Sequence, residues 1–276
     1  MTDSATRFRL AVSGALGRMG RRVLALADGA GADVVAAVDQ PDKADQKLSD
    51  HQVAPAGTPI GDCTLVTGLT AGTDGRTAQV CIDFSTPAAA AKRAAECAAA
   101  GIALVSGTTG GDDTLARALD AAATKVPVLL ASNFSLGVAL AAELTRRAVE
   151  VLGPDFECEI VEFHHSQKVD APSGTALTLA RAAAAGAKVK LDDVISNGRS
   201  GHTGSRPRQV IGVHAVRGGD VVGEHTVYLL GPQERVEITH KAGSRDIFVR
   251  GALRTARWII GQAPGRYAMT DVLASL

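Results

Sequence analysis

The sequence predicts a two-domain α/β protein: a doubly wound nucleotide-binding domain followed by a mixed α+β domain. The first 135 residues alternate short apolar runs with Ala-rich helical stretches, which is typical of βαβ units around a parallel sheet. After about Ser135 the chain becomes β-rich, and apolar residues alternate with polar ones, as in a sheet with one wet face. A chain of 276 residues is long enough to bury two such cores.

In the first domain, strands are expected where apolar residues are contiguous, over residues 8–13, 34–38, 79–84, 102–105 and 126–131. Helices are expected over residues 19–27 and 113–123. A further helix is expected from Pro87 to the C-terminal glycine Gly101, with Ser85 as its N-cap. Residues 41–75 are polar and Gly-rich, and they contain no recognisable motif.

In the second domain, a long helix is expected over residues 138–152 and a strand over residues 158–163. A loop rich in Gly, Ser and Arg follows near residues 197–208. Three more strands are expected, over residues 209–216, 221–230 and 235–240, separated by glycine-containing turns. The chain then returns to a helix over residues 246–260.

Composition narrows the classes of function. The formal net charge is zero, whereas a protein that binds duplex nucleic acid usually carries a basic excess. No apolar run approaches the roughly 20 residues of a membrane span, and the N-terminus has no apolar signal region. The four cysteines are far apart, which argues against a zinc site or a disulfide framework. We therefore expect a cytoplasmic protein with neither a nucleic-acid nor a membrane partner.

A glycine loop lies between the first strand and the first helix. Its spacing is GxxGxxG, and Asp39 ends the second strand 19 residues after Gly20. Such a loop lets a pyrophosphate approach a helix N-terminus, and a carboxylate at that strand end can bind an adenosine ribose. The alternative is an ordinary α/β turn beside a solvated Asp39. The predicted cofactor-binding residues here are Gly14, Ala15, Leu16, Gly17, Arg18, Met19 and Asp39.

Two further loops follow later strands, at the edge where open α/β sheets bind ligands. Small residues in these loops would let a flat nicotinamide ring lie against the backbone. The alternative is a pair of ordinary surface turns. The residues concerned are Gly107, Thr108, Thr109, Ala131, Ser132, Asn133 and Phe134.

The segment from Glu162 to Thr175 concentrates proton donors and positive charge. His164, His165 and Lys168 lie within five residues, and Ser173 begins a helix whose N-terminus suits an anion. The segment therefore suits an anionic substrate that must be protonated. One alternative is a solvated basic loop. Another is a metal site, but adjacent histidines point apart on an extended backbone and no Cys or carboxylate cluster is near.

This segment, EFHHSQKVDAPSGTA, closely resembles the signature of the 4-hydroxy-tetrahydrodipicolinate reductase family. The resemblance continues along the chain in the same order, through GALGRMG, IDFSTP, GTTG, ASNFSLGV, GRSGHTGSR and RGGDVVGEHTV to the closing ITHKAGSRDIFVRGALRTARWI.

The resemblance implies a Rossmann-like parallel-sheet domain over residues 1–135, completed by the C-terminal residues 244–276. It implies a substrate-binding domain over residues 136–243, whose open mixed sheet builds a homotetramer. It further implies that His164 is the proton donor and acceptor, Lys168 a second proton donor, and that His165, Gly174 and Thr175 hold a small dicarboxylate substrate.

The implied reaction reduces 4-hydroxy-tetrahydrodipicolinate to tetrahydrodipicolinate with NADH or NADPH and loss of water, on the diaminopimelate route to lysine. Gln40 stands where some members carry an arginine that binds the 2′-phosphate of NADP, so NADH is expected to serve at least as well.

Two alternatives remain at this point. One is a related amine or diamine dehydrogenase, although the basic histidine–lysine segment does not suit a cationic substrate. The other is an NAD(P)H-sensing protein without turnover, although such a protein would not need the proton donors.

Overall fold

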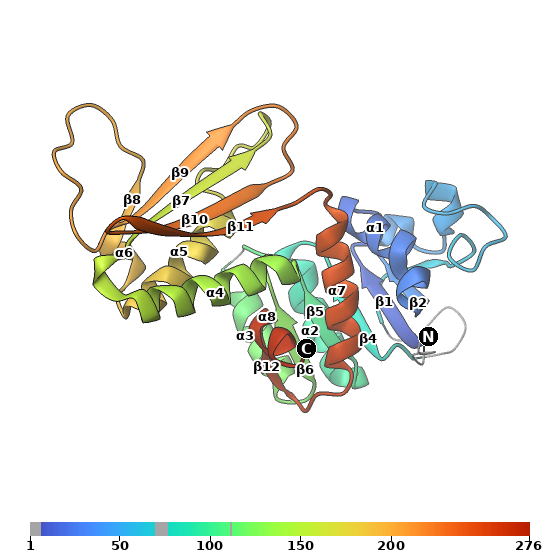
Figure 1. The fold of residues 1–276 in the computed structure, drawn as a ribbon. Helices are drawn as coiled ribbons and strands as arrows, with labels where there is room; N and C mark the ends of the chain where they lie inside the picture. The colour runs from blue at the N-terminus through green and yellow to red at the C-terminus, as the bar shows by residue number, and fades with distance from the viewer. Residues whose placement is uncertain (1–6, 70–76, 111) are drawn as a thin grey trace, which may run out of the picture. The chain divides into compact units, whose positions relative to one another are not determined.

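The computed structural model describes residues 7–69, 77–110 and 112–276. These residues divide into two units, one comprising the chain up to Phe134 together with Asp246–Leu276 and the other comprising Ser135–Arg245. Each unit has its own sheet (Figure 1) and its own apolar core. Among the described residues, no helix combines the length and the apolar character needed to span a membrane.

The first unit is built on a seven-stranded parallel sheet in the order β12-β6-β5-β4-β1-β2-β3. Its strands are β1 (Phe8–Ser13), β2 (Ala32–Val38), β3 (Leu65–Val66), β4 (Val80–Asp83), β5 (Ala103–Ser106), β6 (Pro127–Leu130) and β12 (Gly265–Tyr267). The chain proceeds outward from β1 on one side and then returns to β4 on the other. The order of strands therefore reverses between β1 and β4, and ligands bind at such a point in open α/β sheets.

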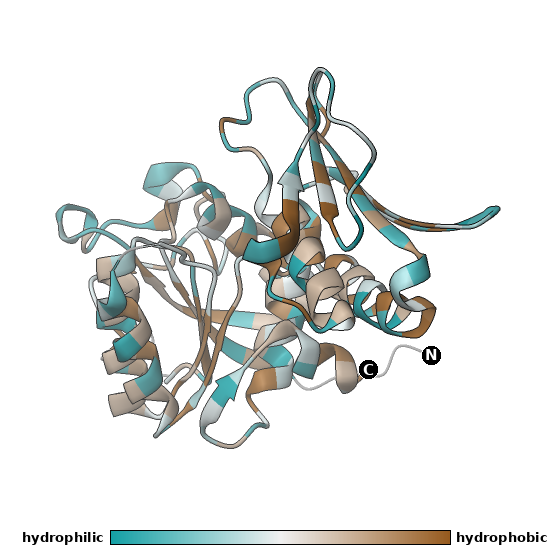
Figure 2. Cartoon of the chain, turned by 90° about the vertical axis from the view of Figure 1, so that its left-hand side faces the viewer, coloured by the Kyte–Doolittle hydropathy of each residue, from teal (hydrophilic) through white to brown (hydrophobic). Residues whose placement is uncertain are grey.

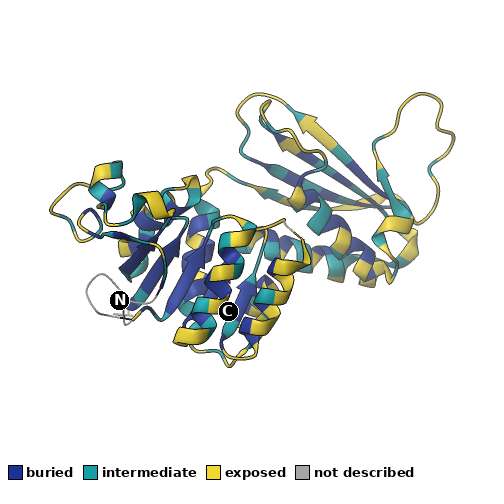
Figure 3. Cartoon of the chain, turned by 180° about the vertical axis from the view of Figure 1, so that it is seen from behind, coloured by how far each residue is buried: buried dark blue, intermediate teal, exposed yellow. Residues whose placement is uncertain are grey.

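Helices cover the parallel sheet, so that its strands are buried (Figure 3). The helices are α1 (Arg18–Ala27), α2 (Pro87–Ala100), α3 (Asp113–Ala123), α7 (Asp246–Ile259) and α8 (Met269–Ala274). Helix α1 packs against α7, and α2 packs against α3. The α2–α3 pair shares an apolar cluster with one face of β4 and β5, which includes Cys81 and Leu104.

Short elements lie within the stretch in which the sequence shows no motif. Two 3₁₀ helices, η2 (Pro41–Lys43) and η3 (Leu48–His51), precede β3, and another, η1 (Asp28–Ala30), precedes β2. Leu48 is fully buried and anchors this segment. Residues 70–75 of the stretch lie outside the described part of the chain.

The second unit contains a five-stranded mixed sheet in the order β11-β10-β7-β9-β8. Its strands are β7 (Glu157–His164), β8 (Ile195–Asn197), β9 (Ile211–Arg217), β10 (Glu224–Gly231) and β11 (Glu234–Lys241). Its helices are α4 (Leu136–Leu152), α5 (Gly174–Ala187), the short α6 (Leu191–Val194) and the 3₁₀ helix η4 (Gly153–Asp155). Figure 2 shows apolar and polar residues alternating along these strands, as expected for a sheet with two unlike faces.

Helices α4 and α5 pack together and against the apolar face of this sheet, around Ile160, Val213 and Val227. In Figure 1 the described helices α4 and α5 lie on one side of this sheet, and side chains of β7 and β9 are exposed on the other. Phe163 is 43% exposed there and its register neighbour Val216 is 39% exposed. This bare face, defined by Phe163 and Val216 with Val161 and Thr226, is called the open sheet face below.

The predicted architecture, a parallel Rossmann-like sheet followed by a mixed sheet, is confirmed. One local prediction is wrong: Thr86, not Ser85, caps α2, because the Thr86 hydroxyl accepts the hydrogen bond from the Ala89 amide. The Ser85 hydroxyl donates instead to the Asp83 carboxyl, 2.6 Å away.

Candidate active site

The glycine loop joins β1 to α1 at the carboxyl edge of the parallel sheet. Gly14 adopts a left-handed φ of +74°, and a Cβ at this position would lie 2.4 Å from the Phe84 carbonyl oxygen. Only glycine therefore allows β1 and β4 to approach here. Gly17 is the N-cap of α1, so the loop presents a helix N-terminus at the point where the strand order reverses.

Asp39 follows β2 and lies against this loop. Its Oδ2 accepts a hydrogen bond from the Leu16 amide at 2.7 Å, and its Oδ1 accepts one from the Gln40 amide at 2.9 Å. The two bonds fix the carboxylate beside the loop. Among the predicted cofactor residues, Arg18 is exposed and Ala15 is buried, so they include both surface and packing positions. The neighbouring Gln40 is exposed.

The two later loops lie on the same edge of the sheet, after β5 and β6. Phe84, which follows β4, and Phe134, in the loop after β6, form an edge-to-face ring pair with centroids 5.8 Å apart, and Gly107 in the loop after β5 lies against both rings. A Cβ at Gly107 would lie 2.1 Å from the Phe84 ring. The structure thus brings the predicted cofactor residues of this unit to one edge, with Phe134 itself buried beneath the loops.

The fully buried carboxyl group of Asp83 ties the loop after β4 to the end of β5 and the loop that follows it. Its two oxygens accept hydrogen bonds from the hydroxyls of Ser85, Ser106 and Thr108 at 2.6, 3.0 and 2.6 Å. The Thr108 hydroxyl also accepts the Ser85 amide at 3.0 Å. The Thr108 side chain therefore points into the protein, and within this predicted site it anchors the loop from inside.

In the second unit, strand β7 carries polar side chains at the end of its buried face. Side chains alternate along a strand, so Glu162 and His164 continue the face that begins with the core residue Ile160. The strand register places His225 of β10 opposite Glu162, and Arg217 of β9 opposite His164. Three strands therefore bring these four side chains to one place.

Glu162 is fully buried and accepts four hydrogen bonds. Arg217 donates to both carboxylate oxygens at 2.7 and 2.8 Å, the Ser173 amide donates at 3.0 Å, and the His164 Nδ1 lies 2.5 Å from Oε2. Burial alone would raise the pKa of Glu162, but these hydrogen bonds, led by those from Arg217, hold it below its usual value. Glu162 is therefore a carboxylate.

His164 has a pKa below its usual value because it is buried, although the Glu162 carboxylate opposes this shift. The His225 ring lies edge-to-face against it with centroids 5.1 Å apart, and the His225 Nε2 is 2.9 Å from the Ser173 hydroxyl. Burial, followed by the nearby His164, lowers the pKa of His225 to about 4. Both rings are neutral near pH 7.

The remaining predicted residues surround this cluster. The Lys168 ammonium lies 2.8 and 2.9 Å from the two Asp170 oxygens. His165 is half-buried, with its Nε2 3.2 Å from the Arg245 guanidinium. Ser173 caps α5 through its hydroxyl, and Gly174 and Thr175 form the first turn of that helix. These residues gather a histidine, cationic groups and a helix N-terminus in one unit.

Sequence reasoning assigns no role to Glu162, Arg217, His225 or Asp83. Glu162, His225 and Asp83 are buried polar residues in strands whose other buried residues are mostly apolar. Arg217 ends β9 and binds the buried Glu162. That pattern could have identified Glu162 within β7. The pairing of β7 with β9 and β10, which brings in Arg217 and His225, depends on strand register and was not accessible.

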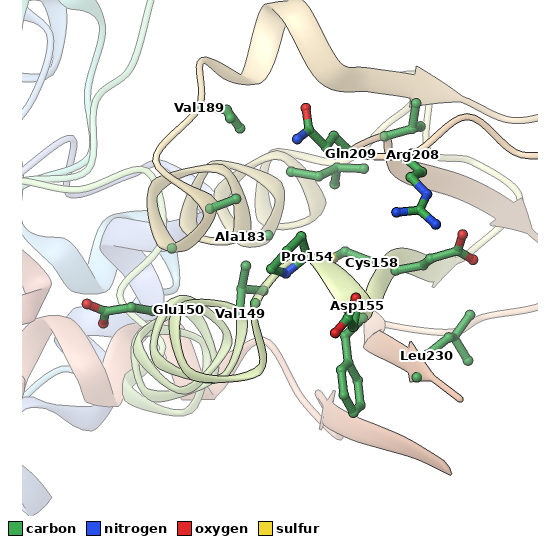
Figure 4. A pocket seen from close by; sticks show the side chains of 18 of the residues that line it. Val149, Glu150, Pro154, Asp155, Cys158, Ala183, Val189, Arg208, Gln209 and Leu230 are labelled. Atoms are coloured by element: carbon green, nitrogen blue, oxygen red, sulfur yellow. The ribbon is translucent and has the colours of Figure 1, made fainter. Parts of the chain in front are cut away.

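A separate cavity of about 660 Å³ lies at the opposite end of β7 (Figure 4). Val149, Asp155, Ala183 and Arg208 are among the residues around it, and none of the predicted site residues lines it. None of the buried polar atoms that lack a partner in the described residues lies there either. The described residues also contain no group of three or more potential metal-ligating side chains.

Comparison with known proteins covers nearly the whole chain. The family model "Dihydrodipicolinate reductase, N-terminus" matches residues 8–134, and "Dihydrodipicolinate reductase, C-terminus" matches residues 137–273. A 4-hydroxy-tetrahydrodipicolinate reductase of Alkalilimnicola ehrlichii is 46% identical over 270 residues, which cover 96% of this chain and 98% of the relative. The 4-hydroxy-tetrahydrodipicolinate reductase of Myxococcus xanthus is 44% identical, over 96% of this chain and 97% of the relative.

Solved structures share the fold. The dipicolinate-bound dihydrodipicolinate reductase of Paenisporosarcina sp. TG-14 aligns with a TM-score of 0.74 at 22% identity, over 95% of this chain and 98% of that one. The amine dehydrogenase of Mycobacterium smegmatis aligns with a TM-score of 0.57 at 13% identity, covering 96% of each chain. At these identities the structures show likeness of architecture alone.

Proposed function

The chain belongs to the dihydrodipicolinate reductase family, and on that premise we propose how its two units divide the family's reaction. The reaction is the reduction of 4-hydroxy-tetrahydrodipicolinate to tetrahydrodipicolinate with NAD(P)H, on the diaminopimelate route to lysine. The observation that carries the proposal is the cluster of Glu162, His164 and Arg217 beside the N-terminus of α5.

The first unit is proposed to bind the nicotinamide nucleotide, which supplies the hydride. The glycine loop fits a pyrophosphate, since Gly17 is exposed and is the N-cap of α1. Asp39 would accept the ribose hydroxyls. The backbone of Gly107–Thr109 and Ala131–Phe134 would border the nicotinamide, with the Phe84–Phe134 pair beneath it.

The second unit is proposed to supply the proton. Replacing a ring hydroxyl by hydride releases water, so each turnover consumes one proton. His164 is the proposed donor and acceptor and Lys168 a second donor, because both belong to one polar cluster next to the substrate-binding helix. Approach of a dianionic substrate would favour the protonated forms of both groups.

The substrate's carboxylates are proposed to bind His165 and the first turn of α5. Backbone amides at a helix N-terminus favour anions, and Ser173 holds this N-terminus in place by capping it. Gly174 has open space where a side chain would lie, which allows a carboxylate to approach the backbone.

The homologues support the reductase and not an amine dehydrogenase, because the relatives at 42–46% identity are all reductases. A cytoplasmic location is proposed from the four buried thiols, which suit a reducing compartment. A homotetramer is proposed because the open sheet face exposes Phe163 and Val216, and a second copy would cover them.

The test is an absorbance assay at the nicotinamide band. The substrate is generated in situ from pyruvate and aspartate semialdehyde by the preceding synthase. We expect NADH oxidation only when both the synthase and this protein are present. Binding of NADH without oxidation would favour the sensor alternative.

A further inference from the structure

We propose that Glu162 is a positioning residue that holds the proton-transfer histidine and the substrate-binding helix in register through one buried carboxylate. The catalytic meaning of this proposal rests on the proposed function of His164, whereas its structural content does not. It is carried by the four hydrogen bonds that converge on Glu162.

The first consequence concerns the proton on His164. Since the bidentate Arg217 keeps Glu162 ionised, both carboxylate oxygens can only accept hydrogen bonds. The His164 Nδ1 lies 2.5 Å from one of them and must therefore be the donor. In the neutral ring the lone pair then belongs to Nε2, which becomes the atom that takes up and delivers a proton.

The second consequence concerns the surroundings of the His164 Nε2. Next to it lies Gly223, where a Cβ would be only 2.9 Å from Nε2. The glycine thus leaves space around the atom that exchanges the proton. The neutral His225 ring also contacts His164 edge-to-face and adds no positive charge. The ring is therefore fixed by packing and by Glu162 together.

The third consequence concerns the helix. The other Glu162 oxygen accepts the amide of Ser173, the N-cap of α5. Arg217, bound to the same carboxylate, also donates to the Asp170 carbonyl oxygen at 2.7 Å, and the Asp170 carboxylate holds Lys168. One carboxylate thus fixes His164 directly, the start of α5 through Ser173, and the Lys168 loop through Arg217.

The direct measurement is the His164 tautomer, from ¹⁵N chemical shifts of the imidazole in the histidine-labelled full chain. The proposal requires Nδ1–H in the unaltered protein near pH 7. Observation of the Nε2–H tautomer would overturn it, whether or not the protein turns over substrate. This readout separates the inference from the proposed reaction, which the coupled assay tests.

The matching variant is Glu162→Gln, which keeps the side-chain shape but offers an amide that can donate to Nδ1. We expect the proton to move to Nε2 and kcat to fall by roughly 10²–10⁴. The Kd for NADH, measured by fluorescence, should stay within about twofold of the unaltered value, because the nucleotide site is assigned to the other unit. An unchanged kcat together with an unchanged tautomer would refute the proposal.

Glu159→Gln is the matched control. Glu159 lies on the same strand, faces the other side of the sheet and accepts hydrogen bonds from Arg199, Arg206 and His214. The variant removes an equally well-bonded carboxylate without touching His164. We expect it to leave the His164 tautomer and the pH profile of kcat unchanged. If Glu159→Gln changed the His164 tautomer or the pH profile of kcat as much as Glu162→Gln does, Glu162 would act only through general stability.

Discussion

At the scale of single residues, His164 is the group on which turnover should depend most. We expect His164→Ala to lower kcat by roughly 10²–10⁴, the usual worth of a positioned general acid. The Kd for NADH should change little, because His164 belongs to the second unit and the glycine loop to the first. Steady-state kinetics and NADH fluorescence titration measure the two quantities separately.

The control for this variant is His202→Ala, which removes an exposed histidine of the loop before β9. It should keep near-normal kcat. If His164→Ala also turns over at the unaltered rate, the proton donor has been assigned to the wrong residue, and Lys168 becomes the leading donor.

Choice of cofactor is a second property decided by single side chains. The Asp39 carboxylate is held against the glycine loop by the Leu16 amide at 2.7 Å, where it would bind a ribose hydroxyl and repel a 2′-phosphate. Gln40 is exposed and neutral, and Lys43 is paired with Asp42 at 3.1 Å. We therefore expect NADH to be used at least as well as NADPH.

Gln40→Arg should shift the ratio of kcat/KM values toward NADPH by roughly tenfold, about 1.4 kcal/mol, because a guanidinium can bind the phosphate in bidentate fashion. Gln40→Leu, which adds no charge, should leave the ratio unchanged. If the unaltered protein already prefers NADPH by more than about tenfold, another cation such as Arg18 must dominate.

Whether the residues of the site can be predicted from the sequence depends on how far apart they lie along the chain. The residues His164, His165 and Lys168 form one continuous segment, and their chemistry was readable as a unit. Arg217 joins Glu162 from 55 residues further on, and nothing in the local pattern specifies that pairing. Glu162 lies near the end of the strand predicted over residues 158–163, and no local sequence pattern marks it as a buried carboxylate.

At the scale of elements, the loop after β5 depends on its internal anchor. The Thr108 hydroxyl donates to the buried Asp83 at 2.6 Å and accepts the Ser85 amide at 3.0 Å. Thr108→Val keeps the shape but removes both bonds, and leaves Asp83 short of a donor. If the lost hydrogen bonds destabilise the binding-competent loop conformation by about 1–2 kcal/mol, the Kd for NADH should rise by roughly five- to thirty-fold.

Thr108→Ser, which retains the hydroxyl, should bind NADH almost normally in the same fluorescence titration. The pair separates an anchoring hydroxyl from simple packing. Equally weak binding in both variants would show that the hydroxyl, which serine retains, does not suffice to anchor the loop, and normal binding in both would remove the anchoring role.

The longer elements were predictable because their apolar periodicity extends over many residues, as in α2 and α4. Elements such as β3, β8 and α6 are too short to show a period, and they form because neighbouring strands and helices supply their partners. The misplaced cap at Ser85 has a similar cause. Ser85 and Thr86 are both residue types that favour the N-cap, but the Ser85 hydroxyl is hydrogen-bonded to the buried Asp83 carboxyl.

At the scale of the whole molecule, the sequence predicted two domains from a change in pattern, and each unit does have its own core. The open sheet face was less accessible to sequence reasoning. Alternation along β7 shows that one face is wetter, but Phe163 stands on that face and is apolar. Only the packing of α4 and α5 against the other face shows that these apolar groups lack a cover within the described residues.

This bare face leads to the assembly prediction. Light scattering at micromolar concentration should give about four times the chain mass of 28.2 kDa. Phe163→Glu would place a charge beside Val216, and burying it between copies would be costly, so smaller species should appear. Val151→Glu is the control, since Val151 is 64% exposed on α4. It should leave the mass unchanged. A monomer mass for the unaltered chain would contradict the tetramer, and equal dissociation of both variants would show that the contact lies elsewhere than on the open sheet face.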